Sequence, residues 1–276
     1  MVIGKNDDHE EELLSLKELI ENSRKIVIKI GSNTLSTDKG EVNLHAMHNI
    51  VDQLVEWMKG GKEIIIVSSG AGICGVGAIN KWFRRKDMNY KQALCAIGQV
   101  ELMMAYKELF KEYDYHVGQL LLTRDDFNDH SRNLHIRNTL FTLVDEGVVP
   151  IVNENDTVSV DEIKIGDNDT LGALTANLWG ADLLIVLSDI DGVYDKNPKE
   201  HPDAKIIRQV TDIDELKRSI STAGTNRFGT GGVVTKIEAA RRVNEFGIHM
   251  ALLNGKKEDI LRKAADGREE GTVFYG

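Results

Sequence analysis

Short apolar runs alternate with helix-like stretches along most of this chain, and this alternation constrains the fold more than any other feature. The runs are rich in Val and Ile, and they lie near residues 25–30, 63–67, 116–122, 148–152, 183–187 and 249–253. Between them apolar residues recur at helical spacing, which predicts helices over 44–58, 91–110, 131–146, 169–179, 232–246 and 256–265. Strands this apolar must be covered on both faces. We therefore expect an α/β protein, a three-layer αβα sandwich around a mostly parallel central sheet.

The chain carries no sign of a division into independent domains. It has 276 residues and three prolines, and no Ser/Pro-rich linker interrupts it. Two lobes within one domain fit this length better than two separate domains. Apolar residues at helical spacing predict a helix over 10–22, so residues 1–22 form a helical extension ahead of the body at 23–276. The segment 157–165 is typical of a small hairpin that projects from the sheet.

Charge and composition argue against several classes of protein. The chain carries 34 Lys and Arg against 44 Asp and Glu, a net charge of −10, whereas a general nucleic-acid binder normally has a basic excess. An anionic substrate would therefore need local lysines, arginines, backbone N–H groups or a metal ion. The acidic N-terminus lacks the apolar core of a signal peptide, and no run reaches the roughly 18 apolar residues of a membrane span. We expect a cytoplasmic protein that binds neither membrane nor nucleic acid.

The cysteines and histidines suggest no metal or disulfide chemistry. Cys74 and Cys95 are too few for a disulfide framework or a four-ligand zinc site, so we expect small buried residues. His45 and His48 are more typical of surface residues than of metal ligands.

Polar residues follow four of the predicted strands directly. They are Gly31–Asn33, Ser68–Gly72, Asn153–Asp156 and Ser188–Asp189. In open parallel sheets, ligands bind outside the carboxyl ends of the strands. We therefore expect these segments to line one ligand site.

A GxGxxG pattern at Gly70–Gly75 allows three interpretations. A dinucleotide site would follow the first strand and have an acidic residue ending a strand about 20 residues later, and neither feature is present. The pattern fits better a glycine-rich turn whose N–H groups approach an anion. Glycines that serve only a tight strand-to-helix turn remain the alternative.

Two lysines are candidates for binding phosphate. Lys29 lies at the carboxyl end of a predicted strand, where it either points into the cleft as a point charge or faces solvent. Lys236 lies near the first turn of a predicted helix, after the glycines at 229–232, in a segment that does not match a Walker A loop. A lysine at a helix start opposes the macrodipole, which favours an anion between the two over a solvated lysine. Asp169, in the turn Gly166–Asp169, is a candidate to cap the next helix and to orient both lysines.

Taken together, these segments resemble the amino acid kinase family and, within it, the glutamate 5-kinase branch. The resemblance covers residues 25–276 and rests on VIKIGSN (27–33), VSSGA (67–71), GQLLLTRDD (118–126), RNTL (137–140), VPIVNENDTV (149–158), EIKIGDND (162–169), LSDIDGVYDKNP (187–198) and GTGGVVTK (229–236). NEND followed by EIKIGDND is specific for this branch, whereas the VKIG-like start and GTGG-like loop are shared more widely. The resemblance implies the amino acid kinase-like fold, with a glutamate-binding lobe at about 23–166 and an ATP-binding lobe at about 167–276.

The resemblance also implies roles for individual residues. Lys29 and Lys236 would stabilise the transferring phosphoryl group, and Asp169 would organise these catalytic lysines. Glutamate would be bound by Ser69, Gly70, Ala71, Asn153, Asp156 and Asn168. ATP would be bound by Lys29, Ser188, Asp189, Tyr194, Thr230, Gly231, Gly232, Val233, Val234, Thr235 and Lys236. No side chain is expected to ligate a metal ion directly, although the family works with Mg²⁺.

The implied reaction is ATP-dependent phosphorylation of the γ-carboxylate of L-glutamate, the first step of proline biosynthesis. Proline as feedback inhibitor, glutamyl-phosphate reductase as pathway partner and a homodimer or homotetramer are further implications. Many relatives carry a C-terminal PUA domain, which we expect to be absent because the sequence stops after GTVFYG. The segment Ser221–Asn226 is the candidate for a closing loop. Two alternatives stay open: another carboxylate or carbamate kinase of this fold, and a non-catalytic sensor of proline or glutamate.

Overall fold

A mostly parallel sheet forms the centre of the molecule. The computed structural model describes residues 1–4, 13–37, 41–79, 87–159, 168–222 and 232–276. Within these residues nine strands form one sheet in the order β1-β9-β11-β10-β6-β2-β3-β5-β4. Its strands are β1 (Val2–Ile3), β2 (Lys25–Ile30), β3 (Glu63–Ser68), β4 (His116–Leu122), β5 (Val148–Glu154), β6 (Leu183–Ser188), β9 (Gln209–Val210), β10 (His249–Asn254) and β11 (Thr272–Phe274). Neighbouring strands pair in parallel except β10 and β11, so the predicted mostly parallel sheet is confirmed.

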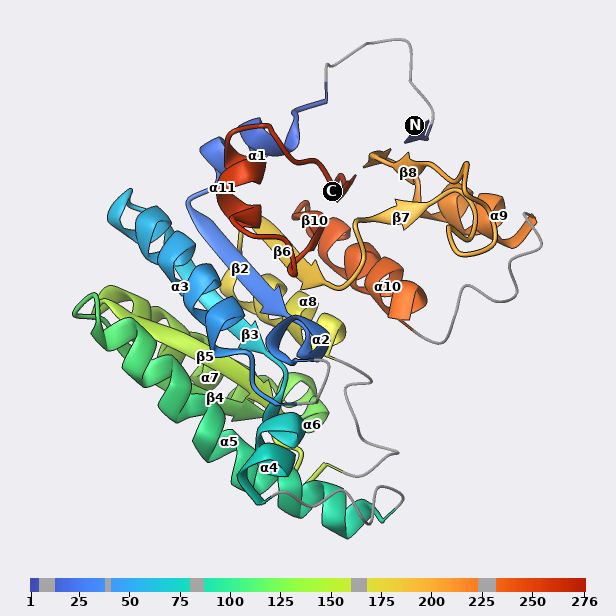
Figure 1. The fold of residues 1–276 in the computed structure, drawn as a ribbon. Helices are drawn as coiled ribbons and strands as arrows, with labels where there is room; N and C mark the ends of the chain where they lie inside the picture. The colour runs from blue at the N-terminus through green and yellow to red at the C-terminus, as the bar shows by residue number, and fades with distance from the viewer. Residues whose placement is uncertain (5–12, 38–40, 80–86, 160–167, 223–231) are drawn as a thin grey trace.

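Helices cover both faces of this sheet (Figure 1). One face packs against α1 (Leu16–Asn22), α3 (Leu44–Lys59), α5 (Met88–Lys111) and α11 (Ile260–Ala265). The other face packs against α7 (His130–Asp145), α8 (Asn168–Trp179), α9 (Ile213–Thr222) and α10 (Gly232–Asn244). The central strand β2 sends Ile26 and Ile28 into the first layer and Val27 into the second. The three-layer αβα sandwich is therefore confirmed.

The sequence-based boundaries hold best for long elements with a clear period. All six predicted strands are present, and the helices predicted over 44–58 and 169–179 match α3 and α8 within a residue. The helix predicted over 10–22 was placed too early, because α1 begins at Leu16 after a capping box between Ser15 and Glu18. The helix predicted over 256–265 also begins later, at Ile260.

Short elements escaped the sequence analysis. They include β1, β9 and β11, a separate antiparallel pair of β7 (Val193–Tyr194) and β8 (Ile206–Ile207), and the helices α2 (Ser32–Leu35) and α6 (Arg124–Asn128). The ten-residue helix α9 was not predicted either. The helix expected after the turn at Gly70–Gly75 is present as α4 (Ala71–Ile79). Two- and three-residue strands are too short to show a period of two. The hairpin predicted at 157–165 falls mainly on 160–165, outside the described residues, and Thr157–Ser159 is not a strand.

The order of the strands decides where a ligand can bind. The chain runs from β2 outward through β3 and then returns to β6, on the other side of β2. The carboxyl ends of β2 and β6 therefore border a topological switch point, where open α/β sheets form a crevice. The two strand ends are tied together there, because the Gly31 N–H donates to the Leu187 carbonyl oxygen over 3.0 Å.

Candidate functional site

A polar cavity of about 570 Å³ lies at these strand ends. It is lined by the ends of β2, β3, β5 and β6 and by the first residues of α2, α4, α8 and α10. Its lining residues are Lys29, Gly31, Ser32, Asn33, Thr34, Ser69, Gly70, Ala71, Gly72, Ile73, Asn153, Asp156, Asn168, Asp169, Ser188, Asp189, Gly232, Thr235 and Lys236. The polar segments that follow four separate strands therefore meet in one site.

Two lysines and one aspartate form a buried ionic cluster in the cavity wall. Asp169 Oδ1 lies 2.6 Å from Lys29 Nζ, and Asp169 Oδ2 lies 2.9 Å from Lys236 Nζ. All three side chains are more than nine-tenths buried. Burial alone would raise the pKa of Asp169, but the two ammonium groups outweigh it and hold this pKa below its usual value. One carboxylate facing two ammonium groups leaves a local excess of positive charge in an otherwise acidic protein.

Local structure explains why these three groups converge. Lys29 shares a strand face with Val27, which packs under α8 and α10, so Lys29 points toward the same helices. Asp169 lies in the first turn of α8. Lys236 lies one turn into α10, where its Nζ also donates to the Gly232 carbonyl oxygen over 3.0 Å. The expectation that Asp169 would orient both lysines therefore agrees with the contacts.

Next to this cluster in the cavity wall, amides and a hydroxyl form a hydrogen-bonded row. Asn168 Nδ2 donates to Ser69 Oγ over 2.8 Å and to Asn153 Oδ1 over 3.0 Å. Ser69 directly follows β3, and its N–H donates to the Ile30 carbonyl oxygen over 3.0 Å. Asp156 completes this wall in the turn after β5. This wall therefore combines neutral amide and hydroxyl groups with the carboxylate of Asp156.

The glycine-rich segment between β3 and α4 has two separate structural tasks. Gly70 adopts a φ of +110°, a backbone conformation that residues with a Cβ rarely adopt. The turn at Gly70 allows α4 to begin at Ala71. The first residues of α4 then face the cavity, as an anion-binding turn requires. Gly75 instead lets α4 touch α5, since a Cβ there would lie 1.9 Å from the Leu94 carbonyl oxygen. The GxGxxG pattern thus combines a turn toward the cavity with a helix contact.

Ser188, Asp189 and Thr235 line the part of the cavity nearest β6 and α10. Asn33 Nδ2 donates to Asp189 Oδ2 over 2.9 Å, and Thr235 Oγ1 donates to Asp169 Oδ2 over 3.1 Å. Burial acts to raise the pKa of Asp189, but hydrogen bonds from Asn33 and Ser188 hold it below its usual value. This side of the cavity therefore contains the carboxylates of Asp169 and Asp189 beside hydroxyl groups.

The structure does not bring every predicted residue into the cavity. Tyr194, Val233 and Val234 are not among its lining residues; Tyr194 donates to Asp191, and Val234 is exposed. Thr230 and Gly231 lie outside the described residues, as does 223–226 of the predicted closing loop. The sequence analysis missed Thr34, Gly72 and Ile73 as lining residues, although the polar segment Gly31–Asn33 pointed to this part of the chain.

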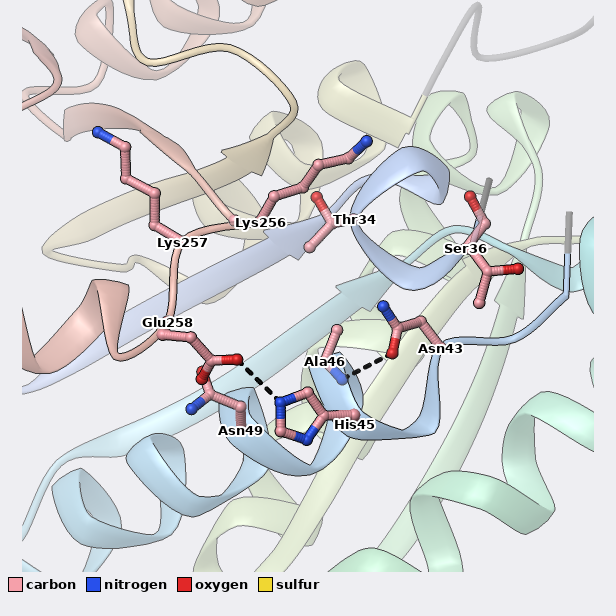
Figure 2. Close-up of a pocket in the computed structure, with 11 residues that line it drawn as sticks. Thr34, Ser36, Asn43, His45, Ala46, Asn49, Lys256, Lys257 and Glu258 are labelled. Atoms are coloured by element: carbon pink, nitrogen blue, oxygen red, sulfur yellow. Dashed lines mark hydrogen bonds and ion pairs between the residues drawn. The ribbon is translucent and has the colours of Figure 1, made fainter. Parts of the chain in front are cut away.

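A second cavity of about 320 Å³ lies between α2, the start of α3 and the loop after β10 (Figure 2). Its histidine, His45, contacts Glu258 over 2.8 Å, and its Lys257 contacts Asp191 over 2.7 Å. None of the predicted site residues lines it. The larger cavity is therefore the candidate active site.

The described residues show no other centre of chemistry of this kind. Within them, no three His, Cys, Asp or Glu side chains group together in a way that could hold a metal ion. Cys74 is buried, which raises its pKa to about 11, and Cys95 is half-buried instead of fully buried as expected. No helix in the described ranges is long and apolar enough to cross a membrane.

The chain is similar to known proteins over most of its length. The amino acid kinase family model matches residues 24–254. The chain is 61% identical over 259 residues to a glutamate 5-kinase of Alkaliphilus metalliredigens, with 94% of this chain and 98% of that protein covered. It is 47% identical to a glutamate 5-kinase of Caldanaerobacter subterraneus, with 91% of this chain and 67% of that protein covered.

Solved structures show the same fold at low sequence identity. The UMP kinase of Bacillus anthracis matches with a TM-score of 0.64 at 15% identity, with 92% of this chain and 96% of that chain covered. An isopentenyl phosphate kinase matches with a TM-score of 0.63 at 17% identity, with 91% and 99% covered. With the family model and the two glutamate 5-kinases in agreement, the chain belongs to the amino acid kinase family, in its glutamate 5-kinase branch.

Proposed function

We propose that this protein phosphorylates the γ-carboxylate of L-glutamate with ATP and releases ADP and γ-glutamyl phosphate. The observation that carries the proposal is the pair of buried lysines on Asp169, which lies one residue from the amide row of Asn168 and Ser69. The proposed binding site for phosphate thus lies next to the proposed binding site for a small zwitterion. The name of the relatives that match nearly full length, glutamate 5-kinase, supports the choice of substrate.

The reaction needs charge neutralisation more than proton transfer. A glutamate side chain has an unperturbed pKa of about 4.3, so the acceptor is ionised at pH 7 and needs no general base. One carboxylate oxygen attacks the γ-phosphorus, a new O–P bond forms, and the bond to the β–γ bridging oxygen breaks as ADP leaves. Lys29 and Lys236 would offset the repulsion between the two anions and the charge that spreads over the γ-phosphoryl oxygens.

The cavity suggests how the two substrates divide the site. Residues of the 23–166 lobe, Ser69 to Ala71 with Asn153 and Asp156, would bind glutamate together with Asn168. Ser69 and the start of α4 would take the acceptor carboxylate, and Asp156 would take the amino group. The 167–276 lobe would bind ATP through Ser188, Asp189, Gly232 and Thr235.

Magnesium fits this site as a companion of the nucleotide. Asp169 already contacts two lysines, and Asp189 is the other carboxylate on the nucleotide side, so phosphate oxygens and water would supply most ligands. When bound, Mg²⁺ would neutralise phosphate charge. Proline inhibition, a reductase that uses the product, a homodimer or homotetramer, a role in proline biosynthesis and a cytoplasmic location stay predictions.

The test is acyl-phosphate formation from Mg-ATP, trapped with hydroxylamine. Candidate acceptors are L-glutamate, N-acetylglutamate, aspartate and carbamate. Product from L-glutamate alone is the expected result. Product from another acceptor would favour a different acid kinase of this fold, and binding of ATP with no product would favour a sensor.

A further inference from the structure

A buried glutamine on α5 supports the amide row from behind. Gln99 does not line the cavity, and its side chain is only 8% exposed. Its Oε1 accepts a hydrogen bond from Asn153 Nδ2 over 2.8 Å. This contact links α5 to β5 directly beneath the predicted glutamate site.

A backbone N–H shows which way the Asn153 amide is oriented. The Glu154 N–H donates to Asn153 Oδ1 over 2.8 Å. Because a backbone N–H can only donate, the Asn153 oxygen must face it, and the Asn153 NH₂ group must face Gln99. If the Gln99 amide were rotated by 180°, its NH₂ group would face the NH₂ group of Asn153. If the Asn153 amide were rotated, its NH₂ group would face the Glu154 N–H.

The orientation of Gln99 leaves its own NH₂ group without a hydrogen bond to any described residue. Its Nε2 is buried and has no hydrogen-bond partner in the described structure. A buried donor without a partner is destabilising. The opposite orientation of Gln99 would abolish the hydrogen bond to Asn153. The Gln99 side chain therefore keeps this hydrogen bond although its own NH₂ group has no partner in the part of the chain that the structure describes.

The effect of this contact extends to the cavity. Asn153 Oδ1, directed by these two partners, accepts from Asn168 Nδ2 over 3.0 Å. The same Nδ2 donates to Ser69 Oγ over 2.8 Å. Both hydrogen-bonding ends of the Asn153 amide are thus engaged within the protein, which makes Asn153 a support for Asn168 and not only a substrate contact.

The geometry points to Gln99 as a positioning residue for the acceptor amino acid, acting through Asn153 on Asn168 and Ser69. This inference rests on the proposed function, because it concerns the glutamate half of the site. Without the Gln99 acceptor, the Asn153 amide keeps only its contacts with the Glu154 N–H and with Asn168 itself. Asn168 would then sample other directions, and the site would bind glutamate less well while the nucleotide side stays intact.

The test compares two buried glutamines in the 276-residue protein. Gln99→Met removes the acceptor with little change in volume. Gln53→Met is the matched control: Gln53 on α3 is fully buried and accepts from the Leu261 N–H over 2.8 Å, on the α11 side of the molecule. We expect Gln99→Met to raise the KM for glutamate roughly tenfold, with kcat and the KM for ATP changed less than about threefold, because only uniform binding is lost. Gln53→Met should lower thermal stability and leave both KM values near wild type.

A double-mutant cycle with Asn168→Ala tests the route of the effect. If Gln99 acts through Asn168, Gln99→Met should change the glutamate KM less than about twofold in the Asn168→Ala background. Should Gln99→Met fail to fold, Gln99→Asn is the second variant, since its shorter side chain withdraws the acceptor from Asn153. An unchanged glutamate KM in a folded Gln99 variant, or additive effects in the cycle, would overturn the inference but leave the proposed function standing. Wild-type enzyme that forms no product from glutamate would overturn both.

Discussion

The contact between α4 and α5 leaves no room for a side chain at Gly98, and this makes Gly98→Ala a sharp test of the structure. A Cβ at Gly98 would lie 1.7 Å from the Ala71 carbonyl oxygen and 2.2 Å from the Gly75 nitrogen. Both atoms belong to the backbone of α4, so no flexible side chain can move aside. The two helices must separate by more than about 1 Å to restore contacts of about 3.4 Å or more.

The size of the effect follows from two opposing contributions. Overpacking of a rigid contact costs about 3 kcal/mol, and alanine in place of glycine inside a helix returns about 1 kcal/mol. The net loss of about 2 kcal/mol corresponds to a fall in Tm of about 4–8 °C for a domain of this size. Because Ala71 and Gly72 line the cavity, a displaced α4 should also raise the KM for glutamate.

Differential scanning calorimetry and the acyl-phosphate assay would measure both effects. Gly77→Ala is the control, because Gly77 lies in α4 at a position where an added Cβ would meet no atom within 4 Å. It should stabilise the protein by up to about 1 kcal/mol and leave the KM for glutamate unchanged. A Gly98→Ala protein with a wild-type Tm would refute the close approach of the two helices.

Three further outcomes follow from individual contacts. Lys29→Ala and Lys236→Ala should each lower kcat by a factor of roughly 100 or more while circular dichroism shows a retained fold, and near-normal kcat would remove that lysine from the mechanism. Lys257→Met removes contacts of 2.7 Å to Asp191 and 2.9 Å to Glu269. Because these groups are partly exposed, chemical denaturation should show the free energy of unfolding lowered by less than about 1 kcal/mol. A decrease several times larger would contradict this reasoning. Burial lowers the pKa of His249, so just below pH 6.5 the unfolded chain binds more protons than the native chain. The protein should therefore have its full stability above pH 6.5 and lose stability as the pH falls below that value. His249→Gln should make this decrease smaller in a plot of Tm against pH.

The sequence predicted the parts of the fold that depend on local pattern. Val- and Ile-rich runs that alternate with amphipathic stretches indicated β2, β3, β5 and β6 with helices on both faces, because the period of side-chain burial is a property of the element itself. The same reasoning placed the polar strand ends at one edge of the sheet. Lys29, Asp169 and Lys236 were therefore expected together, although 67 residues separate Asp169 from Lys236.

Some features of the site have no local signature. Gln99 and Asn153 are 54 residues apart, and nothing in the helix pattern of α5 distinguishes a glutamine that faces β5 from one that faces solvent. Tyr194 also has a contact that its motif did not reveal: its hydroxyl donates to Asp191, and the residue does not line the cavity, so its nucleotide contact stays a prediction. Pairings as short as β1 with β9 also depend on a partner that is 207 residues away.

The sequence alone thus determined the α/β class, the edge of the sheet that carries the site and the charged residues that meet there, because periodicity and strand ends are local and parallel strands share one polar edge. Only the tertiary structure decided which amides support the substrate wall and how closely α4 approaches α5 at Gly75 and Gly98. Those contacts join distant segments over about 2–3 Å. At that scale, the direction of a single amide or the absence of one Cβ decides whether the contact can form. Such detail is set by packing in three dimensions.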